Sequence, residues 1–286
     1  MPTHARPPQL PGDNHVHSEW SWDAEAGAME ASCARAASLG LPAIAFTEHW
    51  DPTPCPIDPA AVPHLPPLIR GLVSPQGVFL APALDVEGYV ARLAECRERF
   101  PRLRILSGVE LGEPHWWPES LAALGRRAEF DRILGSVHCI KIDGRYQYVE
   151  GLYGRLPPGE VVRLYLAEVL RLVESPCAFA ILAHIDYPVR DWPKAAEPYQ
   201  VEAFEDEYRT VLRALAISGR ALEVNTTVPL PAEVVRWWRE AGGKAISFGS
   251  DAHEPAEVAR GFIEAAAMAE AAGFATEGQN SLWVRQ

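Results

Sequence analysis

The 286-residue sequence has no apolar stretch of the roughly 18 residues that a membrane-spanning helix requires. It is also poor in basic residues, since 26 lysines and arginines stand against 38 aspartates and glutamates and leave a formal net charge of -12. A protein that binds along a nucleic-acid backbone needs a basic face, and this balance argues against one. We therefore expect neither a membrane nor a nucleic acid among its partners.

Cysteine is scarce as well. The chain has five cysteines, an odd number, and none of them form a CxxC pair. Reduced thiols in a cytosolic protein are the simplest interpretation of that pattern. The N-terminus begins Met-Pro-Thr-His and has no apolar segment behind its charge, so it does not resemble a secretory signal. We expect a cytoplasmic protein, and the sequence leaves its oligomeric state open.

Motifs of several common enzyme mechanisms are missing. The sequence contains no phosphate-binding P-loop, no GxSxG nucleophile elbow and no Rossmann glycine fingerprint. It also contains no internal repeat and no low-complexity tract. Any catalytic chemistry must therefore come from other residue types.

Short apolar runs alternate with longer helical patterns along the chain. The strand candidates are 14–17, 43–47, 104–110, 132–137, 179–184, 222–225 and 245–249, and the helix candidates are 24–39, 86–100, 118–128, 159–174, 198–218, 231–241 and 255–272. Seven strand–helix units in one series imply a parallel sheet with helical crossovers, and thus an α/β fold.

Six of the nine histidines stand at the ends of the apolar runs, nearly all beside a carboxylate. These clusters contain Asp13, His15 and His17; Glu48 and His49; Glu110; His138; His184 and Asp186; and Asp251 and His253. The carboxyl ends of barrel strands form the face where barrel enzymes keep their active sites. Contributions from six strands favour a closed barrel, because an open sheet binds ligands only near a switch point.

Imidazole and carboxylate are the usual ligands of zinc, manganese and iron, so the clusters predict a metal-dependent hydrolase. No single pair is specific. His15 and His17 are two residues apart and face the same side of a strand, yet most such pairs have no metal. A lone buried histidine is usually only hydrogen-bonded. The joint pattern across six strand ends carries the hypothesis.

One segment interrupts the alternation of strands and helices. Residues 50–82 contain nine prolines, and we interpret them as an insertion over the barrel mouth, since loops of this length are usually functional or mobile. Residues 141–158 are predicted to form a second long loop. The expected organisation is a single barrel domain over 1–286, with the proline-rich insertion at about 50–82.

Together the motifs resemble the polymerase-and-histidinol-phosphatase (PHP) superfamily, over residues 13–274. The resemblance implies a distorted (β/α)7 TIM-like barrel with three divalent metal ions, which could be zinc, manganese or iron. It implies one metal held by His15, His17, Glu110 and Asp251, a second held by Glu110, His138 and His184, and a third held by Asp23, His49 and His253. It also implies that Glu110, Asp251 and His253 are catalytic. Glu19, four residues before Asp23, and Glu48, directly before His49, are nearby carboxylates and are expected to stay outside the ligand set.

The metals imply phosphoester hydrolysis, because a hydroxide bridging two cations is a strong nucleophile near neutral pH. Within the superfamily the chain most resembles stand-alone histidinol-phosphate phosphatases, in the strings DNHVH with SWD, GSVH, LEVNT and GSDAHEP. The expected partner is a small phosphorylated substrate, with L-histidinol phosphate first. The resemblance implies that Arg190 binds the phosphate, and Lys141, Arg145 and Arg155 are weaker candidates.

The chain departs from those phosphatases in one loop. There the Asn-Thr string is followed by a second phosphate-binding arginine, whereas residues 226–231 here contain no basic residue. The substrate therefore stays open, and another small phosphate ester or a phosphodiester is the alternative. A non-catalytic metal-binding PHP module ranks last, because all nine ligand positions keep a competent side chain.

Overall fold

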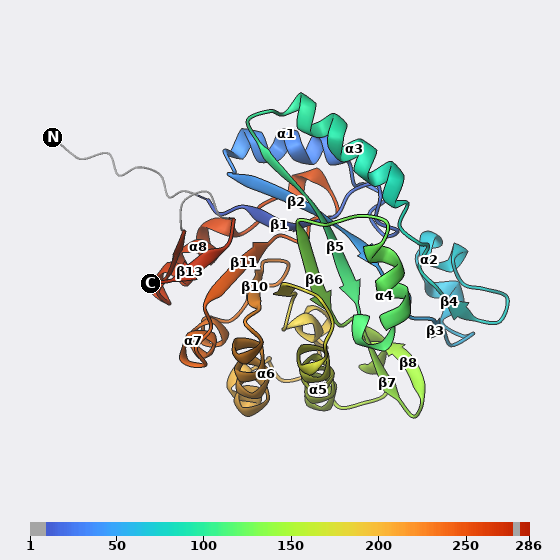
Figure 1. Cartoon of the computed structure of the whole chain (residues 1–286). Helices are drawn as coiled ribbons and strands as arrows, with labels where there is room; N and C mark the ends of the chain where they lie inside the picture. Colours follow the sequence, from blue (N-terminus) through green and yellow to red (C-terminus); the bar gives the residue numbers. More distant parts are fainter. Residues whose placement is uncertain (1–9, 277–280) are drawn as a thin grey trace.

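Seven parallel strands form the centre of the fold, and each arises from one of the apolar runs of the sequence. They are β1 (Asp13–Val16), β2 (Ala43–Trp50), β5 (Arg104–Gly112), β6 (Arg132–Ser136), β9 (Ile181–Leu182), β10 (Ala221–Asn225) and β11 (Ala245–Gly249). They pair side by side in that order (Figure 1). The structure is a computed structural model that describes residues 10–276 and 281–286.

The sheet curls until β1 meets the residues that follow β11. Val16 forms a parallel bridge with Ala252, and the His17 amide donates to the Ala252 carbonyl at 2.8 Å. The Asp251 amide donates to the His15 carbonyl, also at 2.8 Å. Closure depends on this short contact and not on a full ladder, so the barrel is distorted. The predicted distorted (β/α)7 TIM-like barrel is confirmed.

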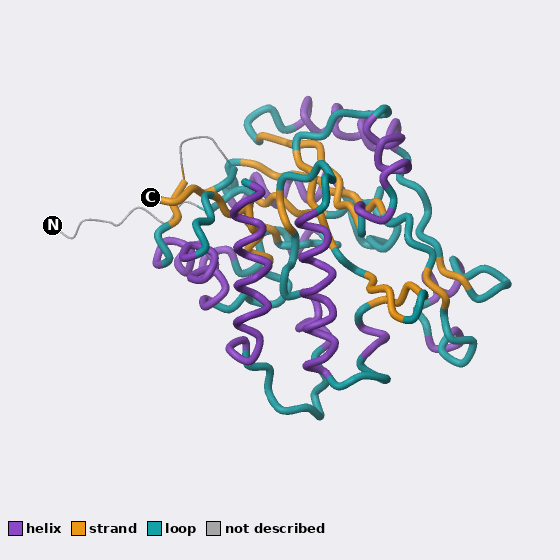
Figure 2. The backbone as a smooth tube through the Cα atoms, turned by 60° about the horizontal axis from the view of Figure 1, so that its bottom comes forward, coloured by secondary structure: helices purple, strands orange, loops and turns teal. Residues whose placement is uncertain are grey.

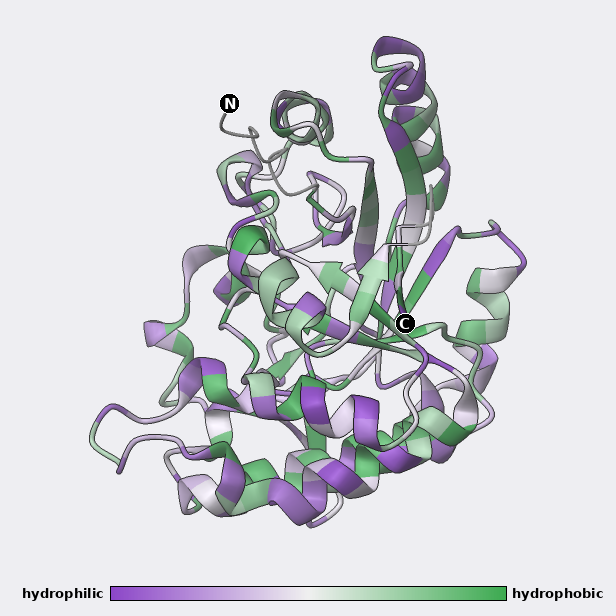
Figure 3. Ribbon diagram, turned by 90° about the vertical axis from the view of Figure 1, so that its left-hand side faces the viewer, coloured by the Kyte–Doolittle hydropathy of each residue, from purple (hydrophilic) through white to green (hydrophobic). Residues whose placement is uncertain are grey.

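Helices connect the strands and cover the outside of the sheet (Figures 1 and 2). They are α1 (Met29–Leu39), α3 (Val86–Arg99), α4 (Pro118–Gly125), α5 (Pro158–Glu174), α6 (Glu205–Ser218), α7 (Ala232–Glu240) and α8 (Phe262–Ala271). Apolar and polar residues alternate along these helices (Figure 3), and the apolar side chains pack on the sheet. None of the helices in the described ranges is both long and apolar enough to cross a membrane.

Three of the predicted helices begin later than the sequence pattern indicates. Those predicted at 24–39, 198–218 and 255–272 start at Met29, Glu205 and Phe262. Gly27 packs so closely that an added Cβ would lie 2.6 Å from the Ser18 carbonyl carbon. Before α8, Ala259 and Gly261 have φ angles of 58° and 71°, which a right-handed helix excludes.

The proline-rich segment contains short elements of its own: β3 (Cys55–Pro56), a 3₁₀ turn (Val62–His64), α2 (Pro67–Gly71) and β4 (Val78–Phe79). Strands β3 and β4 pair in antiparallel fashion. The Phe79 ring lies 5.1 Å from the Trp22 ring and 5.8 Å from the Tyr148 ring. The segment thus packs against loops at the carboxyl end of the strands.

The prediction of a second long loop at 141–158 needs correction, because this segment forms part of a β-hairpin. Strands β7 (Cys139–Ile142) and β8 (Arg145–Tyr148) pair around Asp143 and Gly144, whose φ angles are 51° and 78°. Two consecutive positive φ angles define the hairpin turn that favours Asp-Gly. Two further strands, β12 (Phe274–Thr276) and β13 (Trp283–Arg285), extend the sheet beyond β11 in antiparallel fashion.

Candidate metal centre

The structure brings all nine predicted ligands together at the carboxyl ends of the parallel strands. They come from β1 and the loop after it (His15, His17, Asp23), from β2 (His49), from β5 (Glu110), and from the segments after β6, β9 and β11 (His138, His184, Asp251, His253). His49 and Glu110 are direct neighbours in the β2–β5 register. Seven of the nine are buried, and the side chains of Asp23 and His253 are 25% and 33% exposed. The cluster is therefore reached from the side of Asp23 and His253.

Glu110 lies at the centre of the cluster. Its Oε2 is 3.2 Å from His15 Nε2, 3.4 Å from His17 Nε2 and 3.2 Å from His49 Nδ1. Its Oε1 is 2.6 Å from His184 Nε2 and 3.2 Å from His138 Nε2. Nitrogen atoms of five imidazoles thus lie within 3.4 Å of this one carboxylate.

Two aspartates also contact these imidazole rings. Asp251 Oδ1 lies 3.1 Å from His17 Nε2 and 3.4 Å from His15 Nε2. Asp23 Oδ2 lies 3.2 Å from His49 Nε2 and 3.1 Å from His253 Nε2. The predicted ligand sets are therefore neighbours in space.

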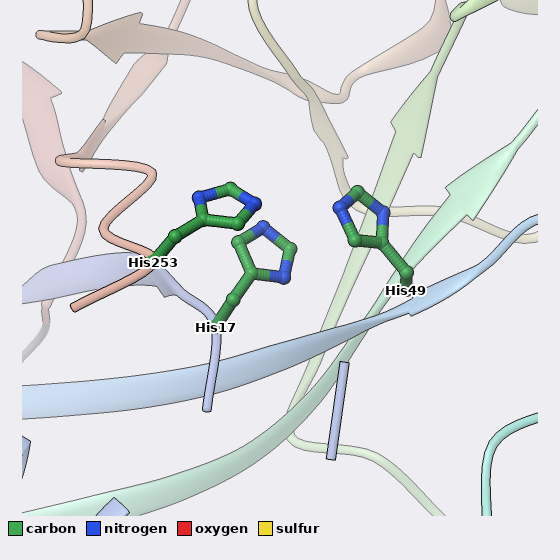
Figure 4. A group of neighbouring side chains, drawn as sticks. All are labelled: His17, His49 and His253. Carbon is green, nitrogen blue, oxygen red and sulfur yellow. The ribbon is translucent and has the colours of Figure 1, made fainter. Parts of the chain in front are cut away.

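The sets also touch one another. The His17 ring stacks on that of His49 at 4.2 Å, and its centroid lies 4.4 Å from that of His253 (Figure 4). One ligand atom from each of these three residues lies within 4.8 Å of the other two, so they too could hold an ion.

The second ring nitrogen of most histidines has a partner behind it. The Nδ1 atoms of His15, His17, His138 and His253 lie 2.7 Å from Glu223 Oε1, 3.0 Å from Ser21 Oγ, 3.1 Å from Asp51 Oδ1 and 2.9 Å from the Asp251 carbonyl oxygen. Metal-binding histidines are held in this way, because the rear contact fixes the ring and its tautomer. His184 differs, since its buried Nδ1 has no hydrogen-bond partner within residues 10–276 and 281–286.

Asp51 and Glu223 were not predicted from the sequence as site residues. Asp51 contacts His138, accepts the Trp22 indole N–H at 3.0 Å and lies 3.2 Å from His49 Nδ1. Glu223 is a charged residue inside the apolar strand run 222–225, and that interruption is the sequence feature that could have revealed it.

The surroundings of the histidines set their charge. Burial, together with the neighbouring His49 and His253, lowers the pKa of His17 to about 3, so its ring is neutral at pH 7. Burial lowers the pKa of His49 too, but the carboxylates of Asp23, Asp51 and Glu110 outweigh it and raise that pKa to about 10. The neutral ring of His17 therefore stacks on a ring, that of His49, whose proton is held by the surrounding carboxylates.

The donor set fits divalent metal ions. Glu110 Oε2 and Asp23 Oδ1 are buried and accept no hydrogen bond of acceptable geometry from the described residues, and a bound cation would satisfy both oxygens. His15 Nε2 and His17 Nε2 are 3.1 Å apart. Two nitrogens bound to one zinc at about 2.0–2.1 Å in tetrahedral geometry lie roughly 3.3 Å apart. The imidazole and carboxylate donors suit zinc, manganese and iron.

Arg190 is the basic candidate that reaches the cluster. Its Nη2 donates to Asp251 Oδ2 at 2.6 Å, and its guanidinium lies 4.9 Å from the centre of the Tyr187 ring. Lys141 of β7 lies over the ring of Tyr146 in β8. Arg155, beyond the hairpin, donates a hydrogen bond to Gln147 of β8. Arg145 begins strand β8.

Glu19 and Glu48, the two glutamates expected to stay outside the ligand set, accept hydrogen bonds from groups outside the cluster. Glu19 accepts the Met29 amide at 2.5 Å, at the start of α1. Glu48 is buried and accepts hydrogen bonds from the Ser18 amide and from the hydroxyls of Ser18 and Ser21. Ser21 in turn contacts His17, so Glu48 supports the cluster from behind.

An apolar groove of about 720 Å³ lies on the opposite side of β5, between this strand and α4. Val109, Leu111, Leu121 and Phe130 line it. Cys177 and Glu129 also belong to this lining, which contains no histidine and no basic side chain. Imidazole and carboxylate groups converge in the histidine cluster and not in this groove.

Comparison with known proteins assigns the family. Residues 13–227 match the family described as the PHP domain. A protein named "Probable histidinol-phosphatase" from Clostridium acetobutylicum is 26% identical over 270 residues, which are 90% of this chain and 92% of that protein. The "Histidinol-phosphatase" of Lactococcus lactis is 25% identical over 274 residues, which are 92% of this chain and 91% of that protein.

A solved structure shows the same fold. The crystal structure of the histidinol phosphate phosphatase from Lactococcus lactis, in complex with zinc, L-histidinol and phosphate, superimposes with a TM-score of 0.74 at 22% identity. The match covers 97% of this chain and 99% of that chain. The chain belongs to the PHP domain family.

Proposed function

We propose that this protein is a metal-dependent phosphomonoesterase that hydrolyses L-histidinol phosphate to L-histidinol and phosphate. The observation that carries the proposal is the contact of both Glu110 oxygens with five imidazoles. It is supported by relatives named histidinol-phosphatase along nine tenths of the chain, and by a similar structure that contains zinc, L-histidinol and phosphate. The activity would place the protein in histidine biosynthesis, as a cytoplasmic enzyme with free cysteines.

The proposed ligand sets are those that the resemblance implies, with three ions of zinc, manganese or iron. The first contains His15, His17, Glu110 and Asp251; the second contains Glu110, His138 and His184; the third contains Asp23, His49 and His253. Bound cations would supply positive charge for the phosphate oxygens and would lower the pKa of a water molecule. Glu110, Asp251 and His253 would position the reacting atoms.

Arg190 would hold the phosphate beside Asp251. Its guanidinium presents a planar fork of donors, and only one of them is used by Asp251. Its side chain is 21% exposed, so a phosphate oxygen can reach the remaining donors. Charge-assisted hydrogen bonds of this kind orient a phosphate as well as bind it.

The turn after β10 contains no basic residue that could bind the substrate. Thr226 and Thr227 close this turn against the end of β11, through hydroxyl contacts of 3.3 Å with the Gly249 and Ser250 carbonyls. The turn therefore offers hydroxyls where the resemblance implies an arginine. Another small phosphate ester is the second candidate substrate.

The experiment is a kinetic panel with zinc- and manganese-loaded protein. Phosphate release should be fastest from L-histidinol phosphate, slower from p-nitrophenyl phosphate and undetectable from a bis-ester. Replacing His15 or Asp251 by alanine should abolish release, whereas His64→Ala, an exposed histidine in the proline-rich segment, should not change it. Preferred hydrolysis of the bis-ester, or no release from any monoester, would overturn the proposal.

A further inference from the structure

We propose that Glu223 is a positioning residue that fixes the metal-binding tautomer of His15 and, at the same time, holds the backbone of His184. This inference rests on the metal binding proposed above. Glu223 lies in β10 and is 1% exposed. Its Oε1 is 2.7 Å from His15 Nδ1, and its Oε2 accepts the His184 amide at 2.7 Å.

The contact with His15 decides which ring nitrogen carries the proton. A carboxylate only accepts hydrogen bonds, so His15 Nδ1 must be the donor. In the neutral ring, which is the form that binds a metal, His15 Nε2 then keeps its lone pair. That atom faces the cluster, 3.1 Å from His17 Nε2, 3.2 Å from Glu110 Oε2 and 3.4 Å from Asp251 Oδ1. Glu223 therefore keeps the inward nitrogen of His15 available to a cation.

The other oxygen of Glu223, Oε2, accepts hydrogen bonds from two donors. It accepts the His184 amide N–H and the Asn225 side-chain amide, the latter at 3.1 Å. The orientation of the Asn225 amide is fixed, because its Oδ1 accepts the Thr227 amide at 2.9 Å. Both groups that face Oε2 are thus obligate donors.

This asymmetry makes glutamine a sharp test. In Glu223→Gln the single amide oxygen must face His184 and Asn225, since both donate. The amide nitrogen must then face His15 Nδ1 and donate to it. His15 would shift its proton to Nε2, the nitrogen that points into the cluster, and an Nε2–H cannot bind a metal.

The side chain has little room to avoid this outcome. Gly249 lies next to it on β11, in register with Asn225. A Cβ at position 249 would lie 2.2 Å from Glu223 Oε1 and 2.6 Å from His15 Cβ. Glycine at this position therefore allows glutamate and histidine to pack side by side.

Glu168 provides the matched control. It is also a buried carboxylate bound to a histidine, with His115 Nε2 2.7 Å from its Oε1. Its helix, α5, packs on the outside of the barrel, and none of the nine predicted ligands is its hydrogen-bond partner among the described residues. Glu168→Gln changes the same chemical group without touching the cluster.

The experiment compares metal binding by wild-type, E223Q and E168Q protein after removal of metal with a chelator. Zinc and manganese are titrated back and the bound metal is counted. We expect E223Q to bind one metal about 10–100-fold more weakly than wild type. We expect E168Q to bind as wild type does. Long-range ¹H–¹⁵N spectra of the histidine rings should show Nδ1–H for His15 in wild type and Nε2–H in E223Q.

The outcomes separate the two proposals. Equal metal number and affinity in folded E223Q would overturn the role of Glu223 while leaving the proposed function intact. A wild-type protein that binds no metal would remove the proposed function itself. If E223Q does not fold, the spectrum of zinc-loaded wild type decides, because an Nε2–H on His15 in that state contradicts the inference without any variant.

Discussion

At the level of single residues, Arg190 connects the proposed substrate site to the histidine cluster through Asp251. Arg190→Ala should raise KM for the phosphate ester and lower kcat/KM by about 10–100-fold, since a hydrogen bond to a charged group contributes about 1.5–3 kcal/mol. Steady-state phosphate release measures the effect. Arg163→Ala, which removes an exposed arginine paired with Glu207, should leave both constants unchanged. Unaltered kinetics in R190A would exclude Arg190 from phosphate binding.

Glu168 should make stability depend on pH. Burial raises its pKa, but hydrogen bonds from His115 and Arg171 outweigh burial and hold the pKa below the ordinary 4.5. A carboxyl group with a lowered pKa stabilises the fold above its ordinary pKa, and the stabilisation is lost as the pH falls through the lowered value. E168Q should therefore reduce the free energy of unfolding by about 2 kcal/mol at neutral pH.

The test is urea unfolding of wild type and E168Q over a range of pH. The difference between the two proteins should shrink as the pH falls from about 4.5 through the lowered pKa, because Glu168 is protonated first in the unfolded protein and then in the native protein. A difference that stays constant throughout the acidic range would show that lost packing, and not lost charge, accounts for the effect.

Sequence patterns are informative about inward-facing ligands and less so about the groups behind them. The convergence of His15, His49, His138 and the other proposed ligands could be predicted, because each stands at or after the end of an apolar strand run. The interrupted apolar run marks Glu223 as unusual, but its role could not be predicted, since that role depends on a contact with His15 across 208 positions of the chain. Closure of the sheet creates this contact, because it places His15 of β1 next to Gly249 of β11, across which Glu223 of β10 reaches.

At the level of elements, the β7–β8 hairpin depends on Gly144. Its φ is 78° and an added Cβ would meet nothing within 4 Å, so only the backbone conformation disfavours a side chain there. Gly144→Ala should destabilise the protein by about 1–2 kcal/mol. Gly151→Ala is the matched control, because Gly151 has equally open surroundings and no positive φ. Chemical unfolding should separate the two variants, and equal effects would contradict the explanation.

The elements differ from their predicted bounds where the backbone leaves regular geometry. The strand predicted at 179–184 shortens to Ile181–Leu182, and His184 has a φ of 20°, outside the β region. Asp251 follows β11 with a φ of 54°. Departures of this kind cluster at functional sites, where they direct side chains. Apolar periodicity cannot reveal them, because it reports burial and not backbone angles.

For the whole molecule, the proposed ligands join segments that are distant in the sequence. His17 and Asp251 are 234 positions apart and meet where the barrel closes through the Val16–Ala252 bridge. The closing contact is short, so β1 has little backbone pairing on that side. Cations bound by side chains of both segments would hold the two edges together more firmly than the bridge alone.

Metal removal should therefore weaken the entire fold and not only the activity. A ligand that binds the native state at about 1,000 times its Kd stabilises it by about 4 kcal/mol, which for a chain of this size raises Tm by roughly 8 °C. Chelator treatment should lower Tm by a comparable amount, and zinc or manganese should restore it, as thermal unfolding followed by circular dichroism can show. His17→Ala should shrink the response, because it removes a ligand at the closing edge, while H64A should keep it in full. If the stripped and loaded proteins unfold at the same temperature, the cations do not tie the barrel together, and the cluster acts only locally.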